Sequence, residues 1–258
     1  MTLKLNKVPP QRCESEIATY TASVEEKLSA GPGPDVRTRR RYYTQLGNFL
    51  LWLGLYEYMA ERPDWVVVDH LARAADIRQE MYEHQQAHGG TGYGSLWSFE
   101  GALALSECFG APERRATIDK IPETAYRFPA LPKDDHYALY VHALKLAVAR
   151  GSIEETSLAR AREACERKPG PDRITMLIRA LAALASGDSA DFNLHLTALV
   201  RHHTAGTESG ELSDSTDGFI CMSGMALGGL ARRLGVPVIV NSHYLPLRLL
   251  ALRGDLHS

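Results

Sequence analysis

The chain has 258 residues, 45% of them hydrophobic and 23% charged, an ordinary composition for a globular protein with a core of its own. Its formal net charge of -2 argues against direct binding to nucleic acid, because proteins that grip phosphates usually carry a basic excess. The four cysteines lie far apart and form no CxxC pair, which indicates free thiols in a reducing compartment and gives no support to a zinc site.

No targeting or membrane segment is evident in the sequence. The first ten residues lack the apolar stretch and the small-residue cleavage site of a signal peptide. The longest apolar run, residues 49–53, is much too short to cross a bilayer. We therefore expect a cytoplasmic protein that makes no use of a membrane.

Three long helices are expected in the first third of the chain. The first covers residues 11–29 and stops at the Gly-Pro-Gly-Pro run of 31–34. Asp35 is expected to cap a second helix that reaches Ala60, and its apolar side chains repeat almost all round, which is typical of a buried central helix. Asp64 is expected to cap a third helix that ends near Ala87.

Two features after this helix invite a chemical interpretation. The glycine-rich run of residues 89–94 could be taken for a phosphate loop, but no strand precedes it and no lysine follows it, so we predict a turn. His84 and His88 have metal-ligand spacing, yet Gln85 stands where a zinc hydrolase has glutamate and no third ligand is nearby. Solvated histidines at a helix end are the preferred interpretation, and we predict no metal and no cofactor.

The middle of the chain contains a candidate boundary. Ser95 or Gly94 is expected to open a helix that Gly110 closes, and a short helix follows Pro112. The prolines at 129 and 132 then bracket a linker. We predict one all-helical domain over 1–258, with a subdivision into 1–128 and 133–258 as the alternative.

Helical hairpins are predicted in the C-terminal half. Two hairpins begin about 37 residues apart, near the period of stacked helical repeats, although no consensus repeat is present. A polar stretch from Thr204 to Gly218 is expected to be a loop, and a helix ending at Gly235 follows it. Residues 236–240 are extended in type, and a short helix follows Tyr244. The fold class is all-α, with about ten helices.

No catalytic constellation emerges from these elements. Asp134 and Asp135 precede a helix, where acids complement the helix dipole and cap free amides. A stretch from Thr204 to Ile220 has no lysine or arginine and contains four acids: Glu208, Glu211, Asp214 and Asp217. It is either a solvated loop or a docking surface for a basic partner, and Asp134 and Asp135 are further candidates for such a surface. Conversely, four arginines at 37 and 39–41 could face an acidic partner or pair along their own helix.

The C-terminal segment carries a more specific pattern. It reads Asp-Gly-Phe-Ile at 217–220, Leu-Gly-Gly-Leu-Ala-Arg-Arg-Leu-Gly-Val-Pro-Val at 227–238, and Asn-Ser-His-Tyr-Leu-Pro at 241–246. This ending resembles that of the immunity proteins of bacterial polymorphic toxin systems, in the group numbered forty-nine. The N-terminal half resembles that group only in being helical.

The resemblance implies a cytosolic antitoxin that binds a cognate toxin and covers its active site or locks it in an inactive state. It also implies a cytosolic target for the toxin, for which a nuclease delivered by a type VI secretion system is the leading class. In that case the acidic stretch could mimic phosphate in a basic cleft.

Two other functions stay open. One is a helical-repeat adaptor for an unrelated protein, which a groove lined by Tyr137, Tyr140 and His142 would favour. The other is a metal-dependent enzyme that uses His84, His88 and nearby carboxylates.

Overall fold

The protein is almost entirely helical in a computed structural model, which describes residues 8–88, 95–126, 131–132, 134–167, 172–213 and 215–252. Within these ranges there are eleven α-helices, three short 3-10 helices and no strand. The α-helices are α1 (Pro10–Ala30), α2 (Val36–Met59), α3 (Asp64–Ala87), α4 (Leu96–Phe109), α5 (Pro112–Thr117), α6 (His136–Arg150), α7 (Glu155–Glu166), α8 (Arg173–Ser186), α9 (Ser189–Ser209), α10 (Met222–Arg233) and α11 (Leu249–Leu252). The 3-10 helices are η1 (Ile118–Lys120), η2 (Glu123–Ala125) and η3 (Thr216–Gly218).

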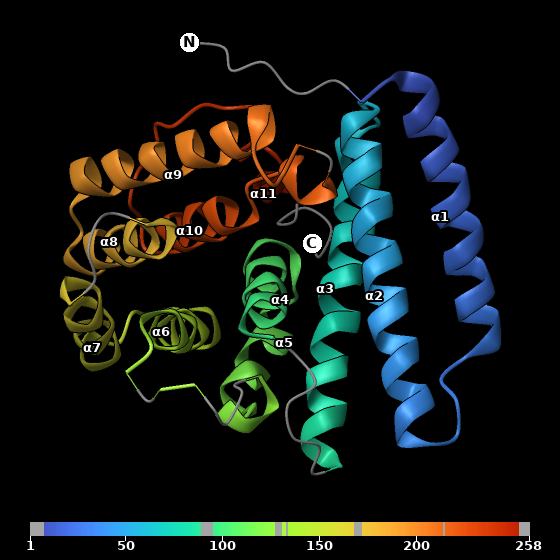
Figure 1. Ribbon diagram of the computed structural model, residues 1–258, viewed down its shortest axis with the longest axis horizontal. Helices are drawn as coiled ribbons and strands as arrows, with labels where there is room; N and C mark the ends of the chain where they lie inside the picture. Colours follow the sequence, from blue (N-terminus) through green and yellow to red (C-terminus); the bar gives the residue numbers. More distant parts are fainter. Residues whose placement is uncertain are drawn as a thin grey trace.

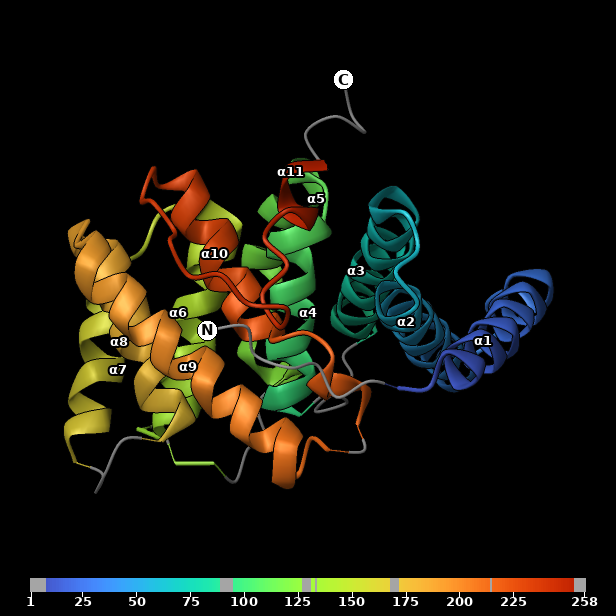
Figure 2. The ribbon, with the colours of Figure 1, turned by 90° about the horizontal axis from the view of Figure 1, so that it is seen from above.

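The helices form two groups on either side of a central pair. Helices α1, α2 and α3 lie side by side as one layer, and α6 to α9 lie on the opposite side of the molecule (Figures 1 and 2). Helices α4 and α10 pack against each other between the two groups, with α4 also touching α3 and α6. The arrangement brings residues from both halves of the chain around α4.

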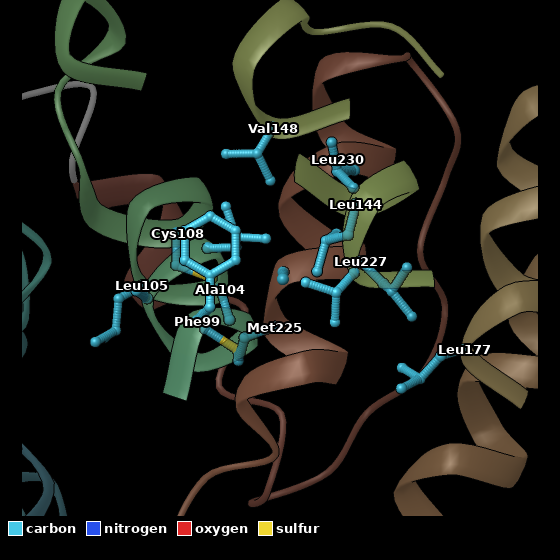
Figure 3. Packing of buried hydrophobic residues seen from close by; sticks show 14 of the residues in the cluster. Phe99, Ala104, Leu105, Cys108, Leu144, Val148, Leu177, Met225, Leu227 and Leu230 are labelled. Carbon is cyan, nitrogen blue, oxygen red and sulfur yellow. The ribbon is translucent and has the colours of Figure 1, made fainter. Parts of the chain in front are cut away.

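The core is continuous through this centre. Phe99 of α4 stacks on Tyr126 with ring centroids 4.0 Å apart. Leu144 and Val148 of α6 face Leu227 and Leu230 of α10 across the same region (Figure 3). These apolar side chains are buried, so their removal from water supplies the main driving force for packing α4, α6 and α10 together.

Local sequence signals set several helix ends, among them the predicted starts at Asp35 and Ser95. Asp35 accepts hydrogen bonds from the backbone amides of Arg37 and Thr38, and Ser95 accepts one from Ser98. Helix α6 ends at Gly151, whose φ of +73° is a left-handed conformation that glycine adopts without strain. The prediction of an all-α fold is confirmed, and residues 236–241, before α11, form neither helix nor strand.

Two boundary predictions were wrong. Helix α9 continues to Ser209, so the first part of the expected loop is helical. Thr204 and Thr207 are buried there and satisfy their hydroxyls inside the protein, Thr204 on the carbonyl of Val200 and Thr207 on that of Thr204. Their polarity therefore does not indicate exposure. At α3, the N-cap position is occupied by Pro63, and Asp64 is the first helical residue.

The C-terminal segment packs back on the N-terminal layer. The Tyr58 hydroxyl of α2 donates a hydrogen bond to the carbonyl of His243, and Arg248 lies 2.8 Å from the Asp64 carboxylate of α3. The Arg248 guanidinium also lies 5.6 Å from the centre of the Tyr58 ring. Specific polar contacts thus join the C-terminal segment to α2 and α3. The subdivision proposed near residues 129–132 stays a prediction.

Across the described ranges, no helix has the length and apolar character needed to span a membrane.

Candidate functional site: a central polar cleft

A cleft of about 790 Å³ lies where the N-terminal layer meets the C-terminal helices. Its walls come from α2, α3, α4, α8, α9, η3 and the start of α10, so residues from both halves of the chain contribute to it. We call it the central cleft. Apolar side chains such as Leu51, Leu55 and Leu199 alternate in it with charged groups, a mixture that is typical of binding sites.

A buried carboxylate organises one part of the central cleft. The Glu100 side chain is 2% exposed, and its Oε1 lies 2.6 Å from Arg173 Nη2. Ser223 donates to the same oxygen at 2.7 Å, and the Tyr137 hydroxyl donates to Oε2 at 2.7 Å. Burial alone would lower the pKa of Arg173, but the Glu100 carboxylate outweighs it and raises that pKa. Arg173 is therefore a permanent cation held in place by its partners.

Arg78 is the second cation of the central cleft. Its Nη2 donates to Asn48 Oδ1 at 2.8 Å. Glycines flank it: a Cβ on Gly47 would lie 3.0 Å from Arg78 Cγ, and one on Gly101 would lie 3.4 Å from Nη1. Arg78 passes between α2 and α4 at Gly47 and Gly101. A larger residue at either glycine would come into close contact with the Arg78 side chain.

The chemistry of the cleft does not suit nucleophilic catalysis. Cys221 and His203 both line it, which invites a cysteine–histidine mechanism. Burial, however, raises the pKa of the Cys221 thiol to about 11 and lowers the pKa of His203 to about 4. At neutral pH both groups are uncharged, and the charge of Arg173 does not offset the effect of burial on Cys221, whereas a reactive thiolate needs a lowered pKa. His203 Nε2 instead donates to the carbonyl of Gly218 at 3.1 Å.

An exposed aromatic residue marks the cleft wall. Trp97, in the first turn of α4, is 56% exposed, and the half-buried Trp52 of α2 lines the same cleft. A large indole left in water forgoes favourable burial, and tryptophan is enriched at the energetic centres of protein interfaces. No local sequence pattern predicted a site at Trp97, Trp52, Arg78, Glu100 or Arg173, which are spread over α2, α3, α4 and α8.

The predicted acidic residues fall into two groups. Glu211 is exposed and Asp217 half-buried, and both line the central cleft. Glu208 is exposed in the last turn of α9, and Asp214 lies outside the described residues. Burial raises the pKa of Asp217, while hydrogen bonding from Ser215 and the charge of Arg78 oppose that rise.

The two other predicted acids do not line this cleft. Asp135 accepts a hydrogen bond from the Ala138 amide as the N-cap of α6, and Asp134 lies 3.5 Å from Arg167. The first contact is that of a helix N-cap, and the second is an ion pair between exposed side chains.

The features behind the alternative functions look different in three dimensions. Tyr140 is fully buried, and the Tyr137 hydroxyl donates a hydrogen bond to Glu100. His142 is half-buried and lies 3.3 Å from the Glu123 carboxylate. These three side chains therefore form no open aromatic groove. The rings of His84 and His88 lie 4.2 Å apart, but no three metal-ligating side chains come together anywhere in the described part of the chain. The glycine-rich run at 89–94 lies outside the described residues.

These observations describe an all-helical protein with a polar cleft between its N-terminal layer and its C-terminal helices. A family model described as Immunity protein 49 matches residues 118–249, just over half of the chain. The chain therefore belongs to the Immunity protein 49 family. Comparisons with curated proteins and with solved structures give no match.

Proposed function

We propose that this protein is a cytoplasmic immunity protein that binds and neutralises a cognate secreted toxin. Membership of the Immunity protein 49 family carries this proposal. The protein acts by occupying a surface of the toxin and performs no chemistry of its own. This is consistent with the uncharged states of Cys221 and His203 at neutral pH.

The toxin is proposed to be a nuclease, delivered by a type VI secretion system and active in the cytosol. Nucleases bind an anionic substrate in a basic cleft, to which an acidic protein surface is complementary. The support for this proposal is the stretch from Thr204 to Ile220, which has four acids and no lysine or arginine. With this stretch bound in the basic cleft of the toxin, the immunity protein would exclude the nucleic acid or hold the toxin in an inactive state.

Co-expression with the neighbouring gene tests the proposal. The gene next to this one is expressed in bacteria alone and together with this protein, and growth and complex formation are measured. We expect the neighbour to kill alone, this protein to restore growth, and the two products to co-purify. Degraded DNA or RNA in the dying cells would support the nuclease assignment, and intact nucleic acid would overturn it. A harmless neighbour that forms no complex would overturn the immunity function itself.

A further inference from the structure

We propose that the central cleft is the toxin-binding site and that it receives an arginine side chain of the toxin between Trp97 and the carboxylates of Glu211 and Asp217. The proposal rests on the immunity function proposed above and adds to it a location and a chemical partner. Three observations support it: the charge of the cleft lining, the half-buried Asp217 carboxylate without a close cation, and the exposed tryptophan of the cleft wall.

The first observation is the charge of the cleft lining. Three carboxylates and two guanidinium groups line it, together with two histidines, His202 and His203, of which the buried His203 is neutral at pH 7. Arg173 is paired with Glu100, which leaves two carboxylates, Glu211 and Asp217, for one remaining guanidinium group, that of Arg78. The excess is acidic, so a basic side chain is the complementary occupant.

The second observation concerns Asp217. Its carboxyl group is half-buried, and burial raises its pKa, so its charged form has lost part of its hydration. Arg78 attracts it electrostatically, but among the described residues the two make no ion pair within 4.0 Å. Arg78 is tied to Asn48 on the α2 side of the cleft, so it does not supply Asp217 with a close cation. A partially desolvated carboxylate without a close cation gains more from an incoming one than a solvated carboxylate does.

The third observation is the tryptophan pair. Trp97 is 56% exposed while lining a cleft, and Trp52 lines the same space. Arginine differs from lysine in having a planar and weakly hydrated head group that stacks on aromatic faces. A site that combines indole faces with carboxylates therefore selects arginine among the basic side chains.

The three tryptophans of the chain provide a test that needs no toxin. The indole N–H signals are recorded by NMR while N-acetyl-arginine methylamide or N-acetyl-glutamate methylamide is added at millimolar concentration. Trp65 serves as the internal control, because it is 62% exposed at the start of α3 and does not line the cleft. Single Trp→Phe variants assign the signals.

We expect the arginine probe to shift the signals of Trp97 and Trp52 while that of Trp65 stays in place. The substitution Asp217→Asn should reduce these shifts severalfold, and the matched substitution Asp69→Asn on the exposed face of α3 should leave them unchanged. Shifts caused by the glutamate probe alone would overturn the proposal and would assign the cleft to an acidic side chain beside Arg78. Equal shifts at all three tryptophans, or none, would also overturn it.

Affinity for the toxin then separates this proposal from the proposed function. Trp97→Ala should weaken binding of the neighbouring gene's product by at least about 30-fold, as expected for an interface hot spot, and Trp65→Ala by less than about threefold. If growth rescue holds but Trp97→Ala binds like the unmodified protein, the immunity function stands and the cleft assignment is overturned. If the neighbour is harmless but the arginine probe binds, the immunity function is overturned and the preference of the cleft for a basic side chain stands.

Discussion

Arg233, the second arginine of the C-terminal Arg-Arg pair, places its Nη2 2.8 Å from Oε2 of Glu107, whose side chain is 1% exposed. The same nitrogen donates to the carbonyls of Ala147 at 2.9 Å and Val148 at 3.3 Å, both in the last turn of α6. One side chain of α10 thereby joins α4 and α6. The pattern that identifies the family ending thus has a structural role in the centre of the fold.

Arg233→Ala should lower the free energy of unfolding by about 3–5 kcal/mol, because a buried carboxylate then loses its cation. Urea denaturation followed by circular dichroism measures the change. The matched control is Arg62→Ala, which removes a pair between exposed side chains, Arg62 and Glu14, and should cost less than about 1 kcal/mol. Equal costs for the two substitutions would contradict a central role for Arg233.

The attachment of the C-terminal segment to α2 can be tested at one hydroxyl. Tyr58→Phe removes the hydrogen bond to the His243 carbonyl and should destabilise the protein by about 1–2 kcal/mol. Limited proteolysis should then release the C-terminal segment faster than in the unmodified protein. Tyr42→Phe is the control, since the Tyr42 hydroxyl on the same helix bonds to no other described residue. Unchanged proteolysis of the Tyr58 variant would show that the segment is held by its apolar contacts alone.

The helices were predictable and the cleft was not, for a physical reason that particular residues illustrate. Asp35, Ser95 and Gly151 act within one turn of their own positions, so the sequence alone shows where these helices begin and end. Ser223 and Glu100, by contrast, are 123 residues apart and share a hydrogen bond only because α4 and α10 pack together. No periodicity along the chain encodes that contact. Of the predicted site residues that the structure describes, Glu211 and Asp217 line the cleft, whereas Glu208, Asp134 and Asp135 do not.

His203 should make the stability of the protein depend on pH. Its pKa is about 4 in the folded protein because burial disfavours the imidazolium, while its ordinary value is 6.5. The unfolded chain therefore binds the proton more readily, so stability is complete above pH 6.5 and falls as the pH drops toward 4. The loss should reach about 3 kcal/mol.

Urea unfolding between pH 7.5 and 4 measures this dependence. His203→Gln keeps a donor for the Gly218 carbonyl but cannot titrate, so its stability should decline less over the same range. His202→Gln changes the exposed neighbour in the same way and should leave the decline as it is. If both variants follow the unmodified protein, another group is responsible for the decline.

The acidic stretch should control the rate of toxin binding. Reversing Glu208, Glu211, Asp214 and Asp217 to lysine should slow association by an order of magnitude or so at low salt, with a smaller effect at high salt where charges are screened. Surface plasmon resonance against the toxin measures both rates. The control reverses four exposed acids on other helices, Glu25, Glu26, Asp69 and Glu113, and so has the same net charge. An unchanged affinity and association rate at low salt would remove the acidic stretch from the interface.

Within this stretch, Glu208 separates function from stability. It lies in the last turn of α9, which contains no basic residue, and an acid there opposes the helix dipole. Glu208→Lys should therefore stabilise the folded protein by about 0.3–1 kcal/mol while it slows binding of the toxin. Both results together would show that Glu208 lowers the stability of the folded protein but contributes to binding of the toxin. If Glu208→Lys stabilises the protein and leaves the association rate unchanged, Glu208 has no such role, and the steering charge must come from the other three acids.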